Sequence, residues 1–181
     1  IIEKTVKAID KPVTVKFRKG FGADEVQAIE MAKAAEAAGA AAVAVHGSTR
    51  EQYYSGKADW EIIAKVKDTV SIPVIGNGDI FSADDFKRIH AQFPNVECFM
   101  MGRGILADPS LAREIRGGKA ADQSDIRRFH DLLYHTYREE VSGDRNVLFK
   151  MKEIWFYLAP MFADSKKYAK KIKKSERCVV Y

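Results

Sequence analysis

Short apolar runs alternate with longer helical patterns along the first two thirds of the chain. Four runs have the length and composition of strands, at residues 13–17, 41–46, 73–76 and 98–102. The segments between them are typical of helices at residues 24–38, 60–70 and 83–92. The first residues, 1–9, read as the end of a helix that leads into a strand. This order of elements predicts a parallel sheet built from repeated strand–helix units.

The apolar runs show little alternation between apolar and polar residues. The segment Ala41-Ala-Val-Ala-Val45 is apolar throughout, as expected of a parallel strand that is covered on both faces. The strands are very short and end in polar residues, which favours a barrel whose active-site groups project from the strand ends. A complete (β/α)8 barrel needs about 250 residues and eight units, and only four are present. We therefore expect an α/β fold, the second half of a TIM barrel.

After Gly117-Gly118 the strand pattern stops and helical patterns follow at residues 124–140, 146–158 and 165–174. The predicted organisation is a half-barrel at residues 1–119 and a small all-α domain at residues 120–181. The residues expected in the core of that domain are Trp155, Phe156, Tyr157, Leu158 and Phe162. A half-barrel leaves two open sheet edges and an uncovered apolar interior, so self-association is also expected.

Charge separates the two parts. Residues 1–123 hold 17 Lys and Arg against 17 Asp and Glu, whereas residues 124–181 hold 13 against 8, so the whole excess of +5 lies in the last third. That asymmetry indicates a polyanionic partner, although a solvated face on surface helices explains it nearly as well. The apolar stretches are shorter than the ~20 residues of a membrane span. Cys98 and Cys178 lack CxxC or metal-ligand spacing, and Cys178 follows the Lys-rich helix in a tail that is expected to be mobile. These features predict a cytoplasmic protein without a metal site or membrane contact.

Candidate ligand-binding residues follow the strands at similar points. The turns Gly76-Asn-Gly-Asp79 and Gly102-Arg-Gly104 end consecutive strands, where glycine lets backbone N–H groups approach a phosphate. Arg103 can add a charge-assisted contact. Lys16 and His46 end the first two strands and are expected to point toward the barrel mouth. Each feature also has a purely structural alternative. The glycine segments are then ordinary turns, Lys16 is a strand-end cation that extends to solvent, and His46 is a core histidine with its hydrogen bonds satisfied.

Four motifs resemble those of the tRNA-dihydrouridine synthases. They are Val15-Lys-Phe-Arg-Lys-Gly20, the run from His46 to Trp60, Pro73-Val-Ile-Gly-Asn-Gly-Asp-Ile80 and Met101-Gly-Arg-Gly104, in the family's order. The resemblance implies reduction of the C5–C6 double bond of tRNA uridines by FMN, with NADPH as the reductant. It further implies that FMN is contacted by Lys16, His46, Asn77, Gly78, Asp79, Gly102 and Arg103.

The sequence departs from the family pattern at two points. Ser48 stands where the family usually has a second arginine, so one anion contact is in doubt. The family's catalytic cysteine belongs to the first half of the barrel, so we expect no catalytic residue here and no activity from the chain alone.

Aromatic and basic residues suggest an RNA surface. Arg50, Tyr53 and Lys57 lie on a loop at the expected barrel mouth, and bases stack on aromatic rings while phosphates pair with cations. In the helical tail the expected phosphate contacts are Lys150, Lys152, Lys170, Lys171, Lys173 and Lys174. Two other functions remain open: an FMN-dependent TIM-barrel oxidoreductase of a small metabolite, or a non-catalytic RNA-binding module.

Overall fold

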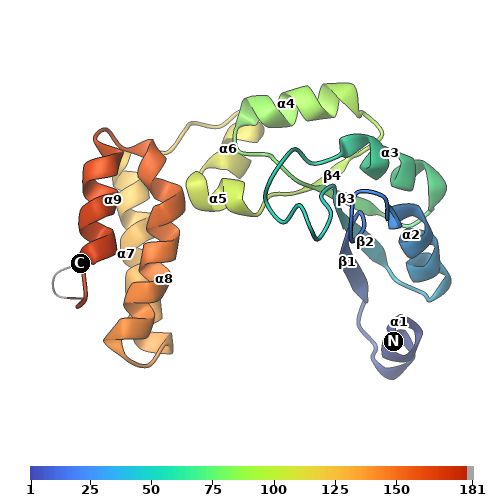
Figure 1. Cartoon of the computed structure of the whole chain (residues 1–181), viewed down its shortest axis with the longest axis horizontal. Helices are drawn as coiled ribbons and strands as arrows, with labels where there is room; N and C mark the ends of the chain where they lie inside the picture. The colour runs from blue at the N-terminus through green and yellow to red at the C-terminus, as the bar shows by residue number, and fades with distance from the viewer. Residues whose placement is uncertain (179–181) are drawn as a thin grey trace. The chain divides into compact units, whose positions relative to one another are not determined.

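The computed structural model describes residues 1–178 and contains a parallel sheet of four strands (Figure 1). The strands are β1 (Thr14–Arg18), β2 (Ala42–His46), β3 (Val74–Asn77) and β4 (Cys98–Met100), and their order in the sheet is the order of the chain. The α/β class and the four parallel strands are as the sequence predicts. Each strand lies within two residues of its predicted bounds.

Helices connect the strands: α2 (Ala28–Ala37), α3 (Trp60–Thr69) and α4 (Ala83–Gln92), preceded by α1 (Ile2–Ala8). Asp59 caps α3 by accepting a hydrogen bond from the Ile62 backbone N–H at 3.0 Å. An aspartate at this position satisfies one of the free N–H groups of the first turn. The helix therefore begins immediately after the loop that leaves β2.

One face of the sheet packs against helices through aromatic side chains. The Phe99 ring of β4 lies 5.7 Å from the Trp60 ring of α3 and 4.9 Å from the Phe86 ring of α4, between centroids. Gly76 makes room for the indole, since an added Cβ would lie 2.5 Å from Cζ3 of Trp60. Because right-handed connections between sequential parallel strands place their helices on one side, α2 belongs on this face too.

The chain forms two compact units. The first comprises residues 1–80 and 84–102, and the second comprises residues 81–83 and 103–181, of which 179–181 are not described. The second unit holds α5 (Arg103–Ala107), α6 (Leu111–Ile115), α7 (Gln123–Glu140), α8 (Asp144–Leu158), the 3-10 turn η1 (Ala159–Met161) and α9 (Ser165–Lys174). Two neighbouring pairs, α7 with α8 and α8 with α9, are in contact (Figure 1).

The core of the helical unit differs from the sequence expectation at two residues. Val147, Leu148 and Met151 of α8 form a buried cluster that also contains Cys178. We expected Cys178 in a mobile tail, but its side chain is buried because it packs against α8, with Sγ 3.4 Å from the Asp144 carbonyl oxygen. Phe156 was expected in the core and is instead 76% exposed.

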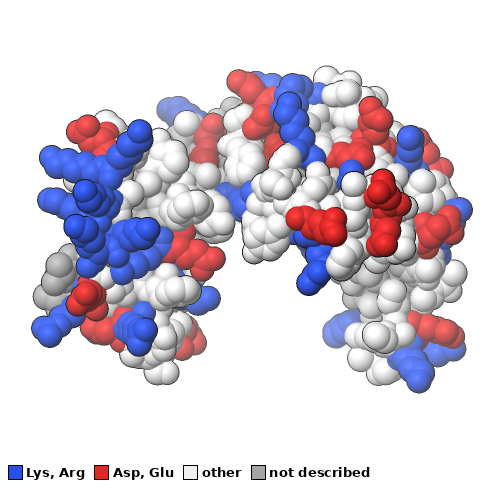
Figure 2. Space-filling view, in the orientation of Figure 1, with Lys and Arg blue, Asp and Glu red and all other residues white. Residues whose placement is uncertain are grey.

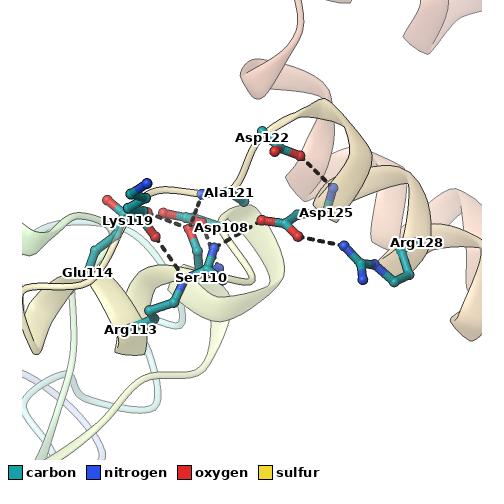
Figure 3. Close-up of polar contacts among 9 residues, drawn as sticks. All are labelled: Asp108, Ser110, Arg113, Glu114, Lys119, Ala121, Asp122, Asp125 and Arg128. Atoms are coloured by element: carbon teal, nitrogen blue, oxygen red, sulfur yellow. Dashed lines mark hydrogen bonds and ion pairs between the residues drawn. The ribbon is translucent and has the colours of Figure 1, made fainter.

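The segment between α6 and α7 is fixed by side chains on both sides (Figure 3). The Ser110 hydroxyl accepts a hydrogen bond from the Ala121 backbone N–H at 2.9 Å. Arg113 donates to the Lys119 carbonyl oxygen at 2.7 Å and to the Asp125 carboxylate at 3.1 Å. The boundary that the sequence predicts between residues 119 and 120 falls inside this segment of the second unit, and it stays a prediction.

Candidate functional site

Polar side chains line up across the carboxyl ends of the strands. Arg18 pairs in register with His46, His46 with Asn77, and Asn77 with Met100. Because side chains in register in a parallel sheet point to the same face, these four residues form one row. The Asn77 side-chain amide donates to the Met100 carbonyl oxygen at 2.8 Å, which ties the ends of β3 and β4 together.

The row lies on the face opposite the aromatic helix contacts. Lys16 stands two residues before Arg18 and therefore shares its face, and its side chain is exposed. Partial burial and the nearby Arg18 guanidinium both lower the pKa of Lys16 from its ordinary 10.5, because each disfavours the charged amine. Cys98, on the same face, is also exposed. This face thus presents Lys16 of β1 and Cys98 of β4 to solvent, whereas the β2 residues between them are buried.

The turn after β3 admits only glycine at its centre. Gly78 has φ +145°, and an added Cβ would lie 2.3 Å from the Cβ of Ala58. Asp79 follows with φ +49°, and its carboxylate accepts a hydrogen bond from the Ala58 backbone N–H at 2.6 Å. The backbone N–H of Gly47 donates to the Asn77 carbonyl oxygen at 3.1 Å. The turn is therefore fastened to the loop that follows β2.

His46 ends β2 and is 7% exposed. Its ring lies beside the Gly78 turn, since the nearest ring carbon, Cδ2, is 3.6 Å from the position of a Cβ on that glycine. Gly102 contrasts with Gly78, because a Cβ there would meet no atom within 4 Å. Gly102 is the last residue of the first unit, and Arg103 belongs to the second, where its guanidinium lies 5.2 Å from the Phe81 ring centroid.

Arg18 holds the loop between β2 and α3. Its guanidinium donates to the carbonyl oxygens of Thr49 and Tyr53, at 3.2 and 3.0 Å. It also lies 5.9 and 5.8 Å from the ring centroids of Tyr53 and Tyr54, within cation–π range. The sequence prediction missed Arg18. The signal available was its spacing of two from Lys16, which places both side chains on one face of a strand.

The three loop residues predicted to bind RNA lie in different settings. Tyr53 is 64% exposed and has the uncommon φ of +51°. The Arg50 guanidinium lies 5.0 Å from the Phe21 ring centroid, and its backbone N–H donates to the Gly20 carbonyl oxygen. Lys57 is exposed. The structure brings Arg50 to the loop after β1 and Tyr53 to Arg18, so both belong to the surface around the ends of β1 and β2.

Asp59 connects this loop to the end of β1 through an ion pair. Its carboxylate lies 3.0 Å from the Lys19 ammonium. Burial by itself would raise the pKa of Asp59, but the hydrogen bond from the Ile62 N–H and the Lys19 contact outweigh burial and hold that pKa below its ordinary value. The carboxylate is therefore charged at neutral pH.

The lysines predicted to bind phosphates belong to α8 and α9. Lys150, Lys170, Lys171, Lys173 and Lys174 are exposed, and Lys152 is half-buried. Lys152 and Lys173 line one groove between the two helices. The structure thus brings these two together, while Lys170, Lys171 and Lys174 extend along α9 beside it.

Comparison with known proteins gives consistent matches. A family model described as dihydrouridine synthase matches residues 1–178. The tRNA-dihydrouridine synthase B of Pseudomonas aeruginosa is 43% identical over 171 residues, which cover 89% of this chain and 50% of that protein. A probable tRNA-dihydrouridine synthase of Rickettsia bellii is 45% identical over 142 residues, covering 76% of this chain and 43% of that protein.

The chain spans about half the length of the curated relatives it matches. Among solved structures, a nitroalkane oxidase from Streptomyces ansochromogenes is 24% identical with a TM-score of 0.36, covering 58% of this chain and 37% of that one. A likeness this weak carries no argument about the fold or the chemistry. No helix among residues 1–178 is both long and apolar enough to cross a membrane.

Proposed function

The chain belongs to the dihydrouridine synthase family, and from that premise we propose that it supplies the FMN phosphate-binding half of an enzyme that reduces uridine in tRNA. The observation that carries this proposal is the sheet face on which Lys16, the Arg18–His46–Asn77 row and the Gly78 turn occur together. Cations and a glycine turn at the carboxyl ends of parallel strands suit a phosphate-bearing cofactor.

The half-barrel prediction is part of this proposal. Parallel sheets are normally covered on both faces, yet in the first unit Lys16 and Cys98 are exposed on the face opposite α3 and α4. A sheet with helices on one face and strands in sequential order is the arrangement of a barrel wall. We infer that further strand–helix units complete the barrel in the parent protein, as the greater length of the relatives suggests.

The residues present fit FMN. An exposed lysine beside an arginine offers positive charge to the electron-rich side of the ring system, and His46 offers a donor at the end of the neighbouring strand. Gly78 and Gly102 carry no side chain that would keep the backbone from an anion. FMN, when bound, supplies the redox chemistry, with NADPH as its reductant.

Asp79 has a positioning role in this proposal. Its carboxylate is engaged by the Ala58 N–H, and a free carboxylate would repel a phosphate. We infer that Asp79 holds the turn in shape so that Gly78 can contact the cofactor through its backbone. Arg103, which follows Gly102 directly in the chain, adds a charge-assisted contact to the phosphate end.

The tRNA surface in this proposal has two parts. Arg50, Tyr53 and Lys57 offer aromatic rings and positive charge near the strand ends, and the lysines of α8 and α9 offer phosphate contacts. Catalytic protonation of the uracil is assigned to a residue outside this chain. Cys98 lies on the same face as Lys16 but begins β4, two residues before Met100 of the row, and Cys178 is buried in the helical unit.

The test compares two lysine variants in the enzyme with both barrel halves. Lys16→Ala should weaken FMN binding at least tenfold, because it removes a charge-assisted contact of about 1.5–3 kcal/mol. Lys33→Ala is the matched control, since this exposed lysine of α2 pairs with a neighbouring glutamate, Glu30, and lies outside the candidate site. Flavin-fluorescence titration measures the affinity. Equal affinities for the two variants, or no flavin binding by the unsubstituted enzyme, would contradict the assignment.

A further inference from the structure

A groove with an apolar wall runs between α8 and α9 of the helical unit. Its volume is about 560 Å³, and its lining includes Phe149, Phe156, Ile172, Lys152 and Lys173. Phe149 and Phe156 are 70% and 76% exposed, and their spacing of seven places them two turns apart on one face of α8. Large aromatic side chains left in water on one face mark an interaction surface.

A second groove continues the first along α8. It has a volume of about 440 Å³ and shares Phe149 and Lys152 with its neighbour. Its lining is more polar and includes Arg145, Asn146 and Ser175. From Arg145 to Phe156 the helix rises roughly 16 Å at 1.5 Å per residue, so the combined track is long enough for more than one nucleotide.

The surroundings of the groove are strongly basic. Figure 2 shows lysine and arginine side chains gathered over α9. This helix carries six lysines and no acidic residue, and none of the six forms an ion pair with an acidic residue among residues 1–178. An occupant that brings negative charge would neutralise them. Two acidic residues contribute to the lining, Glu153 in the first groove and Glu176 in the second.

These charges decide between possible occupants. A second copy of the chain, docked groove to groove about a two-fold axis, would bring the lysines of both α9 helices together, which is unfavourable. A lipid surface needs a flat apolar face, whereas the apolar side chains here line a groove, with Ile172 of α9 contributing one wall and Phe149 and Phe156 of α8 the other. A polyanion with flat apolar groups satisfies both the lysines and the phenylalanines.

We propose that the α8–α9 groove binds unpaired nucleotides of the RNA substrate. The rings of Phe149 and Phe156 stack on bases, and Lys152 and Lys173 hold the flanking phosphates. Glu153 accepts hydrogen bonds from the exocyclic amines of a base, as carboxylates do when they contact cytosine. Stacking on aromatic rings is tolerant of sequence, so the two rings contribute affinity for an unstacked segment, and any preference among bases comes from the Glu153 contact. This inference rests on the proposed function, in which the partner is tRNA.

The experiment separates stacking from charge. Binding of the 181-residue chain to a labelled single-stranded oligoribonucleotide and to a blunt RNA duplex of the same length is measured by fluorescence anisotropy over a range of salt concentrations. The variant Phe149→Ala/Phe156→Ala removes only exposed rings, so circular dichroism should show an intact fold. Leu132→Ala is the matched control, because Leu132 is 66% exposed on α7 and lines neither groove.

We expect the double variant to bind the single strand at least tenfold more weakly, since it loses the stacking of bases on both rings. Its dependence on salt and its duplex affinity should match those of the unsubstituted chain. Lys170→Ala/Lys171→Ala should instead flatten the salt dependence for both RNAs. Leu132→Ala should change neither the affinity for the single strand nor its salt dependence.

Each contrary outcome has a distinct meaning. Salt-dependent RNA binding that the phenylalanine substitutions leave unchanged would overturn the groove assignment while the proposed function stands. Absence of RNA binding by the unsubstituted chain would remove the support for both. Tighter binding to vesicles of anionic phospholipid than to either RNA, lost in the phenylalanine variant, would overturn the inference in favour of a membrane surface.

Discussion

Replacing Gly78 by alanine tests whether the turn after β3 is as tightly built as its geometry indicates. A non-glycine residue at a φ of +145° costs about 1–3 kcal/mol in backbone strain. The new Cβ would lie 2.3 Å from the Ala58 Cβ, so one of the two segments must move by about 1 Å, at a further cost of about 1–3 kcal/mol. The sum, roughly 2–6 kcal/mol, is a large part of the 5–15 kcal/mol that stabilises a typical domain.

The assay must report on the first unit alone. The chain has two tryptophans, Trp60 in the first unit and Trp155 in the second, so a Trp155→Phe background leaves Trp60 as the probe. In urea, Gly78→Ala should lower the unfolding midpoint by on the order of 1 M, for an m value of about 2 kcal/mol/M. Ala58 would also be displaced from the Asp79 carboxylate, so the turn should lose its shape before the unit unfolds.

Gly102→Ala is the control for the same substitution. Its Cβ would meet no atom within 4 Å, so we expect a stability change within about 1 kcal/mol of zero. If Gly78→Ala unfolds at the same urea concentration as Gly102→Ala, the close approach of the turn to Ala58 does not determine the stability of this unit. The argument that position 78 requires glycine, so that its backbone can approach an anion, would then fail as well.

Three further predictions address the phosphate contact, the loop and the catalysis. In the enzyme with both barrel halves, Arg103→Ala should weaken FMN binding roughly tenfold to hundredfold, and unchanged affinity in a flavin titration would refute the contact. Because the pKa of Asp59 is lowered on folding, its contribution to stability is present above the unfolded pKa and is lost as pH falls through the folded pKa. Asp59→Ala, which also removes the cap of α3, should therefore cost about 1 kcal/mol in urea unfolding at pH 7 and progressively less in acid, and a pH-independent difference would count against the charged carboxylate. The 181-residue chain alone should form no dihydrouridine with FMN, NADPH and tRNA, and turnover that disappears in Cys98→Ala would overturn both that expectation and the placement of β4.

The elements that could be predicted from sequence are those with a strong local pattern. The helix at residues 83–92 and the helix at residues 165–174 have the predicted bounds, because a cap or a charged amphipathic pattern marks their ends. The short helices α5 and α6 were not predicted. Each has only five residues, which is too few for a helical period to show.

Long-range packing explains the remaining differences. Cys178 is far in sequence from α8, and no local pattern indicates that its thiol completes the cluster of Val147, Leu148 and Met151. Phe156 lies in an aromatic run that reads as core, but the helix turns its ring outward while Leu158, two residues later, is fully buried. The side of a helix that faces the core depends on the neighbouring helices, which the run itself does not specify.

Backbone hydrogen bonds, as well as side-chain contacts, hold the parts of the candidate site together. Lys19 N–H donates to the His46 carbonyl oxygen, and Gly47 N–H donates to the Asn77 carbonyl oxygen, so the parallel ladder continues one residue past the strands. Asp59 N–H then donates to the Gly47 carbonyl oxygen, which brings the end of the loop back to its start. The first two of these bonds join the ends of neighbouring strands, and the third joins the residue after His46 to the cap of α3. Because buried backbone groups must be paired, a shift of the β2 end would break its bonds to both β1 and β3, and this coupling holds Lys16, His46 and the Gly78 turn in fixed relation before any cofactor arrives.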